Sequence, residues 1–517
     1  MKKCPFHQYQ KRGEGGERRS VPSNGENNEA ARRITRIYAH MVGHRDYGAI
    51  PGPKEFDMVS YRTGNHKYIS SLHNTYGDII KINLKGTDFV FVRKPSVVKK
   101  VLTSEDLFDK TFADADSNST PYVQYFKNLI QPLFASSKVF GSSDNSTRRQ
   151  GLKKCFMSGE SLVPKFHAIC CEVLEKHWPS HYDLLKIDQG AEQTSDSLNR
   201  LHLLVFSMVS VIMCGDVIDV VREELDNLYG AATICLQHFV NRYTTPMFTE
   251  QISPEDEKFM KLVEDAGLKV TKKFVQHSKT NNISGITESS LLGVMLDFGL
   301  SLEEMNTTML NGLFAACEAP IHVLGKLLVE LSEQKSIQSN LFDEIASRNM
   351  FEGSNVKAVK EGALADYITD DSYLDAVVME GLRLFSPVTL VQRRAKRGGL
   401  VLDGYHIPTN TNVCVCIHSV HENNMYFENS GVFNPSRTTL DMVMLDTDNC
   451  FMPFSSGPRG CPGRYLAVTF VKIALTNIIS KYDIQQSGQK HQLPDAKIFK
   501  FVEYPTDGIY LNMKLRE

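Results

Sequence analysis

Cys461 stands in a stretch of unusual composition near the C-terminus, FMPFSSGPRGCPG over residues 451–463. Glycine permits backbone angles that other residues resist and proline restricts them, so this composition predicts a stiff loop rather than a helix. Residues 464–480 are apolar at helical spacing, which places Cys461 just before a helix N-terminus. Amide groups and the helix dipole favour a thiolate there. Such a thiolate could be a nucleophile, a redox group or a metal ligand, whereas a lone cysteine is more often a buried structural residue.

The residues around Cys461 resemble the haem-binding loop of the cytochrome P450 superfamily, F-x-x-G-x-R-x-C-x-G. Every fixed position is matched, by Phe454, Gly457, Arg459, Cys461 and Gly463. The resemblance implies that the Cys461 thiolate is the axial ligand of haem b (iron protoporphyrin IX), where it favours O–O cleavage. It also implies that Arg459 pairs with a haem propionate and that the glycines let the loop approach the porphyrin closely.

A glutamate lies in the middle of a long apolar stretch, residues 301–331. Ser301 and Glu304 form a capping-box pattern, and the apolar stripe that follows predicts a helix of about thirty residues, roughly 45 Å long. Pro320 removes one backbone hydrogen bond and predicts a kink. Glu318, on the same turn, is costly to bury unless it is paired or used in chemistry.

The turn around Glu318 resembles the central-helix motif of the same family, A/G-G-x-D/E-T. Ala315, Ala316 and Glu318 take the first, second and acidic positions, with Ala316 in place of a glycine. Ala319 replaces the threonine whose hydroxyl helps to deliver protons in dioxygen activation. Family members without this alcohol include monooxygenases that use substrate or water instead, and peroxygenases, isomerases and dehydratases. The resemblance therefore implies haem binding but leaves the reaction open, and Glu318 is either a proton relay or a buried acid paired with an arginine.

Glu380 and Arg383 stand three residues apart on a predicted helix over residues 371–385, where they can form an ion pair. Alone, this pattern is most often a surface pair. About eighty residues before Cys461, it resembles the E-x-x-R helix of the family, and Arg437 lies in a segment that resembles F-x-P-x-R. The resemblance implies a buried Arg–Glu–Arg network that locks the haem loop, in which loss of one member leaves an unpaired charge.

Two further arginines occupy positions where the family binds haem propionates. Arg149 stands where the arginine of a W/H-x-x-x-R helix would stand, although Asn145 replaces the aromatic residue. Arg393 or Arg394 holds a second such position, and Arg394 is the preferred choice. Residues 388–391 would then line the substrate pocket. Residues 108–141 resemble in position the family's loop over that pocket, or form an ordinary surface loop.

The chain has 517 residues, 42% of them hydrophobic, and a net charge of −2. This composition supports a large core and argues against a nucleic-acid partner. Eleven cysteines without a secretion signal indicate a reducing compartment. Residues 1–29 are polar, so they predict a disordered tail rather than a signal peptide. The most apolar run, residues 203–214, is too short to span a bilayer, so we expect no transmembrane anchor and a soluble cytoplasmic or membrane-peripheral protein.

Apolar periodicity predicts helices over residues 192–214, 218–239 and 255–277, and alternation predicts a β-hairpin over residues 78–92. No internal repeat or break in composition divides residues 30–517, which we expect to form one domain. With the resemblance, these patterns imply a mainly α fold with small β-sheets (α+β), a single large cytochrome P450-like domain with its long central helix over the haem.

The leading functional hypothesis is a haem-thiolate monooxygenase that oxidises an apolar or amphipathic small molecule. Its electrons would come from NAD(P)H through a separate reductase or ferredoxin, because the sequence contains no G-x-G-x-x-G signature. A haem-thiolate enzyme that does not activate dioxygen is the alternative that Ala319-Pro320 favours. A non-catalytic haem protein that binds a ligand or gas is a third hypothesis, from a different class.

Overall fold

A computed structural model describes residues 45–84, 86–109, 162–178, 197–244, 253–281, 290–352, 355–369, 371–437, 450–486, 497–499, 502–504, 509 and 511–516. The predicted tail, Arg149 and nearly all of residues 108–141 lie outside these ranges. The described helices are η2 (Tyr47–Ala49), α2 (Met58–Tyr76), α3 (Pro95–Thr103), α7 (Val163–His177), α9 (Ser197–Cys214), η4 (Gly215–Val221), α10 (Arg222–Thr244), α11 (Pro254–Thr280), α12 (Leu291–Asp297), α13 (Leu302–Glu333), α14 (Lys335–Ser347), α15 (Glu361–Thr369), α16 (Tyr373–Leu384), α17 (Ile417–His421) and α19 (Arg464–Lys481). The strands are β1 (Ile79–Leu84), β2 (Thr87–Val92), β3 (Phe108–Asp109), β4 (Phe351–Glu352), β5 (Asn355–Val359), β6 (Leu390–Ala395), β7 (Leu400–Leu402), β8 (Tyr405–Ile407), β9 (Asn412–Cys416), β10 (Tyr482–Gln486), β11 (Lys497–Phe499), β12 (Val502–Tyr504) and β13 (Leu511–Leu515). The predicted mainly α fold with small sheets is confirmed.

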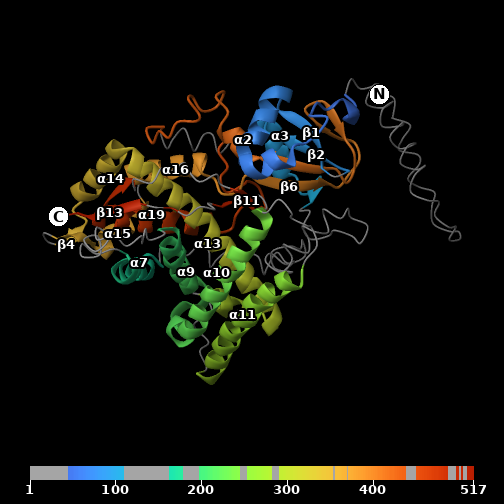
Figure 1. Cartoon of the computed structure of the whole chain (residues 1–517). Helices are drawn as coiled ribbons and strands as arrows, with labels where there is room; N and C mark the ends of the chain where they lie inside the picture. The colour runs from blue at the N-terminus through green and yellow to red at the C-terminus, as the bar shows by residue number, and fades with distance from the viewer. Residues whose placement is uncertain are drawn as a thin grey trace, which may run out of the picture.

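The largest sheet joins strands from opposite ends of the chain (Figure 1). Its order is β1-β2-β9-β6-β3, in which β2 and β9 run parallel and the other neighbours antiparallel. The predicted hairpin is the β1–β2 pair. Helix α2 covers one face of the sheet through Ile69 and Leu72. Helix α3 covers the other face through Val98 and Leu102, so each face has its own buried cluster.

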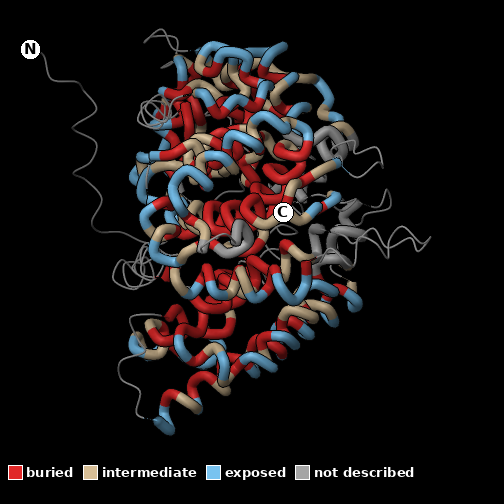
Figure 2. The backbone as a smooth tube through the Cα atoms, turned by 90° about the vertical axis from the view of Figure 1, so that its left-hand side faces the viewer, coloured by how far each residue is buried: buried red, intermediate tan, exposed pale blue. Residues whose placement is uncertain are grey.

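Helix α13 crosses the centre of the helical part of the molecule and packs against α9, α11 and α19 (Figure 1). Figure 2 shows that buried residues gather in the interior of the molecule and exposed residues lie along its outer edges. It begins with the predicted capping box, because Ser301 Oγ accepts the Glu304 N–H at 3.2 Å and Glu304 Oε2 accepts the Ser301 N–H at 3.1 Å. Pro320 lies inside it. Most of its side chains are buried on all sides, as expected of a helix that organises a core.

The helix predicted over residues 218–239 is two elements in the structure, η4 and α10. Gly215 adopts a φ of 59°, a conformation that ends helices, so α9 stops there and the chain continues as a 3₁₀ turn. Apolar periodicity alone does not distinguish a tight turn from the first turn of a helix.

Within the part of the chain that the structure describes, two stretches are long and apolar enough to cross a membrane, residues 200–235 and α13. In each, 72% of the most apolar window is buried inside the protein. Core helices of soluble proteins have the same length and composition, and the packing of α13 explains its apolar character without a bilayer.

Candidate active site

Backbone hydrogen bonds close the loop that carries Cys461. The Cys461 N–H donates to the Phe454 carbonyl at 2.9 Å, and the Gly460 N–H donates to the Gly457 carbonyl at 2.9 Å. Helix α19 begins at Arg464, three residues after the cysteine. The Cys461 side chain is exposed, whereas the other described cysteines are buried or partly buried. An accessible sulfur on a rigid loop before a helix N-terminus suits a thiolate ligand.

Gly457 is required where the loop passes helix α3. Its φ is 75°, and a Cβ at this position would lie 2.5 Å from the Leu102 carbonyl oxygen. Both the conformation and the close approach exclude a larger residue. Gly457 thus allows the loop to pack closely against α3. The close approach of the loop to a porphyrin, expected from the sequence, stays a prediction. A Cβ on Gly463 would lie 4.0 Å from Cys461 Sγ, an ordinary van der Waals distance, so this contact does not itself require glycine.

Arg459, two residues before Cys461, has a largely buried guanidinium group. Its Nε donates to Glu105 Oε1 at 2.9 Å, and the side chain is 11% exposed. Its Nη1 is buried and has no hydrogen-bond partner among the described residues. A buried guanidinium N–H is costly to leave unsatisfied, so an anionic group such as a haem propionate would complete it. The accessible thiol and this remaining donor fit a haem.

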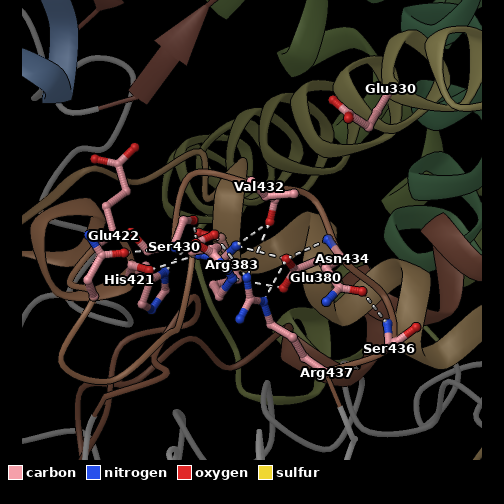
Figure 3. A network of polar contacts seen from close by, with 12 residues as sticks. Glu330, Glu380, Arg383, His421, Glu422, Ser430, Val432, Asn434, Ser436 and Arg437 are labelled. Atoms are coloured by element: carbon pink, nitrogen blue, oxygen red, sulfur yellow. Dashed lines mark hydrogen bonds and ion pairs between the residues drawn. The ribbon is translucent and has the colours of Figure 1, made fainter.

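Glu380, Arg383 and Arg437 meet in one buried network (Figure 3). Arg383 donates from Nε to Glu380 Oε2 and from Nη2 to Glu380 Oε1, both at 2.8 Å. Arg437 Nε donates to the same Oε1 at 3.1 Å, and the Asn434 N–H donates to it at 2.9 Å. Arg383 and Glu380 have essentially no exposed side-chain surface. The structure therefore brings together the three residues that the sequence singled out for this network.

His421 connects this network to the cysteine loop, and sequence reasoning missed it. Arg383 Nη1 donates to the His421 carbonyl at 2.8 Å, and His421 Nδ1 lies 3.1 Å from the Arg383 carbonyl. The Met452 N–H, at the start of the loop, donates to His421 Nε2 at 2.9 Å. Burial, aided by the charges of His418 and Arg383, lowers the pKa of His421 to about 3. Nothing in the sequence around residues 417–421 distinguishes this ring from a surface histidine.

The middle turn of α13 is more exposed than most of the helix. Ala315 is exposed and Ala316, Glu318 and Ala319 are partly exposed, so this turn faces open space rather than packed core. Glu318 Oε1 lies 4.0 Å from Nδ1 of His202 on α9, and its Oε2 is buried without a hydrogen-bond partner among the described residues. Burial raises the pKa of Glu318 to about 8. Among the described residues, the group nearest to the carboxyl is thus a histidine rather than the arginine considered from the sequence.

Arg393 and Arg394 lie on opposite faces of β6, since side chains alternate along a strand. Residues 390 and 414 belong to the cluster under α2, and residues 395 and 413 to the cluster that contains Leu102 and Met452. The strand register pairs Arg393 with Val413 and Arg394 with Asn412. Arg393 therefore lies on the face of the sheet that α3 and the start of the cysteine loop cover. Arg393 is 5% exposed, and its Nη1 donates to the Gln392 carbonyl at 2.9 Å. Arg394, preferred from the sequence, is on the face toward α2.

The cysteine loop at a helix N-terminus, its remaining arginine donor and the buried network define a haem-thiolate protein. The cytochrome P450 family model matches residues 52–511. The chain belongs to the cytochrome P450 family and is accordingly a haem-thiolate oxidoreductase of the monooxygenase type.

Individual relatives are distant in sequence and close in fold. Cytochrome P450 26B1 of Xenopus tropicalis is 25% identical over 424 residues, which cover 80% of this chain and 76% of the relative. The crystal structure of the cytochrome P450DA heme domain superposes with a TM-score of 0.70 at 18% identity, covering 92% of this chain and 98% of that one. Retinoic acid bound cyanobacterial CYP120A1 superposes with a TM-score of 0.68 at 18% identity, covering 90% and 99%. At these identities the structures establish the fold.

Proposed function

We propose that this oxidoreductase inserts one oxygen atom from dioxygen into an apolar or amphipathic small molecule. The observation that carries the proposal is the accessible Cys461 two residues after the partly buried Arg459, whose buried Nη1 has no hydrogen-bond partner among the described residues. When bound, the haem supplies the redox centre at which dioxygen is activated.

The residues divide into those that hold the haem and those that brace its loop. Cys461 would provide the thiolate ligand, and Arg459 and Arg393 would bind the propionates as charge-assisted donors. Arg149 remains a proposed propionate ligand from the sequence alone. The network of Glu380, Arg383 and Arg437 braces the loop and takes no part in the chemistry.

Glu318 would supply protons to the reaction. Its partly exposed carboxyl belongs to the same turn of α13 as Ala316 and Ala319. The raised pKa of Glu318 keeps it protonated at neutral pH, so it can donate. Because Ala319 has no hydroxyl, the carboxyl would act directly or through water.

The substrate is proposed to be lipid-like or a natural product, because the residues that would line its pocket, Val388 and Val391, are apolar and only partly buried. One structural relative binds retinoic acid, an amphipathic carboxylic acid, which makes it a suitable first probe. Electrons would come from NAD(P)H through a separate reductase or ferredoxin. We place the protein in the cytoplasm, soluble or peripheral to a membrane.

The test is turnover under isotopically heavy dioxygen. Haem-loaded full-length protein, a generic reductase system and either retinoic acid or a host metabolite extract are incubated, and product masses are compared with a no-enzyme control. A product that carries one heavy oxygen atom supports the proposal and gives the substrate mass. Absence of any enzyme-dependent product from both sources would contradict the proposed substrate class.

The second candidate is a reaction without dioxygen activation, such as peroxide-driven oxidation, rearrangement or coupling. Ala319 followed by Pro320 favours it, because the alcohol that assists dioxygen activation is missing from the partly exposed turn. A new product without the heavy atom, formed equally well when dioxygen is removed, would establish this candidate instead.

A further inference from the structure

Glu318 and His202 form a polar pair between α13 and α9, helices that pack side by side (Figure 1). Oε1 of the carboxyl lies 4.0 Å from Nδ1 of the imidazole. The side chains are only 20% and 11% exposed, so water reaches both poorly.

Burial sets the protonation of the two groups in opposite directions. It raises the pKa of Glu318 to about 8 and lowers the pKa of His202 to about 4. At neutral pH the carboxyl therefore carries a proton and the imidazole does not. Once the carboxyl has given its proton away, the carboxylate 4.0 Å from the ring favours an imidazolium, because an opposite charge at this distance stabilises it.

Two other titratable groups sense the charge of Glu318, Tyr229 on α10 and Cys317 on α13 itself. Burial is the main cause that raises the pKa of both, so neither carries a charge at neutral pH. Among the described residues, the imidazole is thus the neighbour best suited to pick up a proton and pass it to the carboxylate.

We propose that His202 positions Glu318 and is the group through which its carboxyl exchanges protons with solvent. In each cycle the Glu318 O–H bond breaks toward the reaction side, the His202 ring takes one proton from solvent, and the ring passes it to the carboxylate. One proton enters and one leaves, and no other bond changes. A separation of 4.0 Å exceeds a hydrogen bond, so transfer needs a small side-chain rotation or one bridging water. The destination of the proton rests on the proposed function, whereas its route does not.

The route can be measured without turnover. The carboxyl C=O stretch of Glu318 is the infrared band that Glu318→Gln removes, and its isotopic shift is followed after rapid mixing of the haem-loaded protein into D2O. His202→Gln keeps a polar side chain that cannot carry a proton, so the exchange is expected to slow at least about tenfold. Tyr229→Phe, the matched control on α10, is expected to keep the wild-type rate within about twofold.

Unchanged exchange in His202→Gln would overturn the proposal, as would equal slowing in Tyr229→Phe, which would assign the effect to packing. The wild-type protein gives a second test if the variants do not fold. Exchange through an imidazolium quickens as pH falls below 7, whereas exchange that quickens only with rising pH would contradict the route. If the heavy-dioxygen assay fails while exchange depends on His202, the proposed function falls and the proton route stands.

Discussion

His421 and Met452 are joined by a backbone-to-ring hydrogen bond that sets the start of the cysteine loop. The Met452 N–H donates to Nε2, so the ring proton must lie on Nδ1, which faces the Arg383 carbonyl. The ring also stacks on Phe451, with centroids 5.5 Å apart. The neutral His421 ring thus links helix α16, which holds the E-x-x-R residues, to the segment that leads to Cys461.

Replacing His421 by glutamine is expected to destabilise the protein by about 2–4 kcal/mol, because a buried donor and a buried acceptor lose well-placed partners. The haem content after purification should fall with it. Urea unfolding and the haem-to-protein ratio measure the two effects. His177→Gln, on the exposed end of α7, is the matched control and should change stability by less than about 0.5 kcal/mol. Equal free energies of unfolding for the two variants would show that the hydrogen bonds of His421 do not stabilise the protein.

Glu380→Gln leaves two arginines without their shared counter-charge, one of them fully buried. We expect a loss of about 3–5 kcal/mol, since an uncompensated buried charge is far more costly than a broken surface pair. Glu172→Gln breaks the exposed pair with Lys176 and serves as the control, with an expected loss below about 0.5 kcal/mol. Urea midpoints that coincide for the two variants would contradict a structural role for the network.

Local sequence signals predicted the elements well because each depends on nearby residues. The capping box at Ser301 and Glu304 and the β1–β2 hairpin are both present in the structure. The Glu380 network could be proposed only through the resemblance, since its members come together from positions 57 residues apart.

Contacts set by tertiary packing could not be predicted from the sequence. His421 matters because α17 delivers it to Met452, and His202 matters because α9 lies against α13. The choice between Arg393 and Arg394 depends on strand register, and a one-residue change of register exchanges the faces. No local pattern encodes any of these three relationships.

The register of β6 predicts different rates of haem release when Arg393 and Arg394 are replaced by alanine. Arg393→Ala should release haem about ten- to a hundredfold faster, because a charge-assisted hydrogen bond to a propionate is worth about 1.5–3 kcal/mol. Arg394→Ala, on the face toward α2, should release haem within about twofold of the wild-type rate. Transfer of haem to excess apomyoglobin measures both rates. Faster release from Arg394→Ala than from Arg393→Ala would identify Arg394, the residue preferred from the sequence, as the propionate ligand.

Gly457→Ala tests how the loop is seated on α3. The added methyl group would lie 2.5 Å from the Leu102 carbonyl oxygen at a φ of 75°, so the loop must shift. We expect a loss of at least about 2 kcal/mol and a reduced haem content. Gly431→Ala is the control, because its Cβ would meet no atom within 4 Å. Full haem occupancy and unchanged stability in Gly457→Ala would mean that the loop can move without cost.

The opposite pKa shifts of Glu318 and His202 predict opposite pH windows for stability. Glu318 has a folded pKa of about 8 against a usual value of 4.5, so its contribution is complete below pH 4.5 and is lost as pH rises toward 8. His202 has a folded pKa of about 4 against 6.5, so its contribution is complete above pH 6.5 and is lost as pH falls toward 4. Each slope is limited to about 1.4 kcal/mol per pH unit.

Urea unfolding across this pH range separates the two contributions when each variant is compared with wild type. Relative to Glu318→Gln, the wild-type protein should lose stability as pH rises from 4.5 to 8, because the folded state keeps a proton that the unfolded state has released. Relative to His202→Gln, it should lose stability as pH falls from 6.5 to 4. A difference from Glu318→Gln that does not change with pH would show that the carboxyl titrates normally, and it would remove the proton donor from the proposed mechanism.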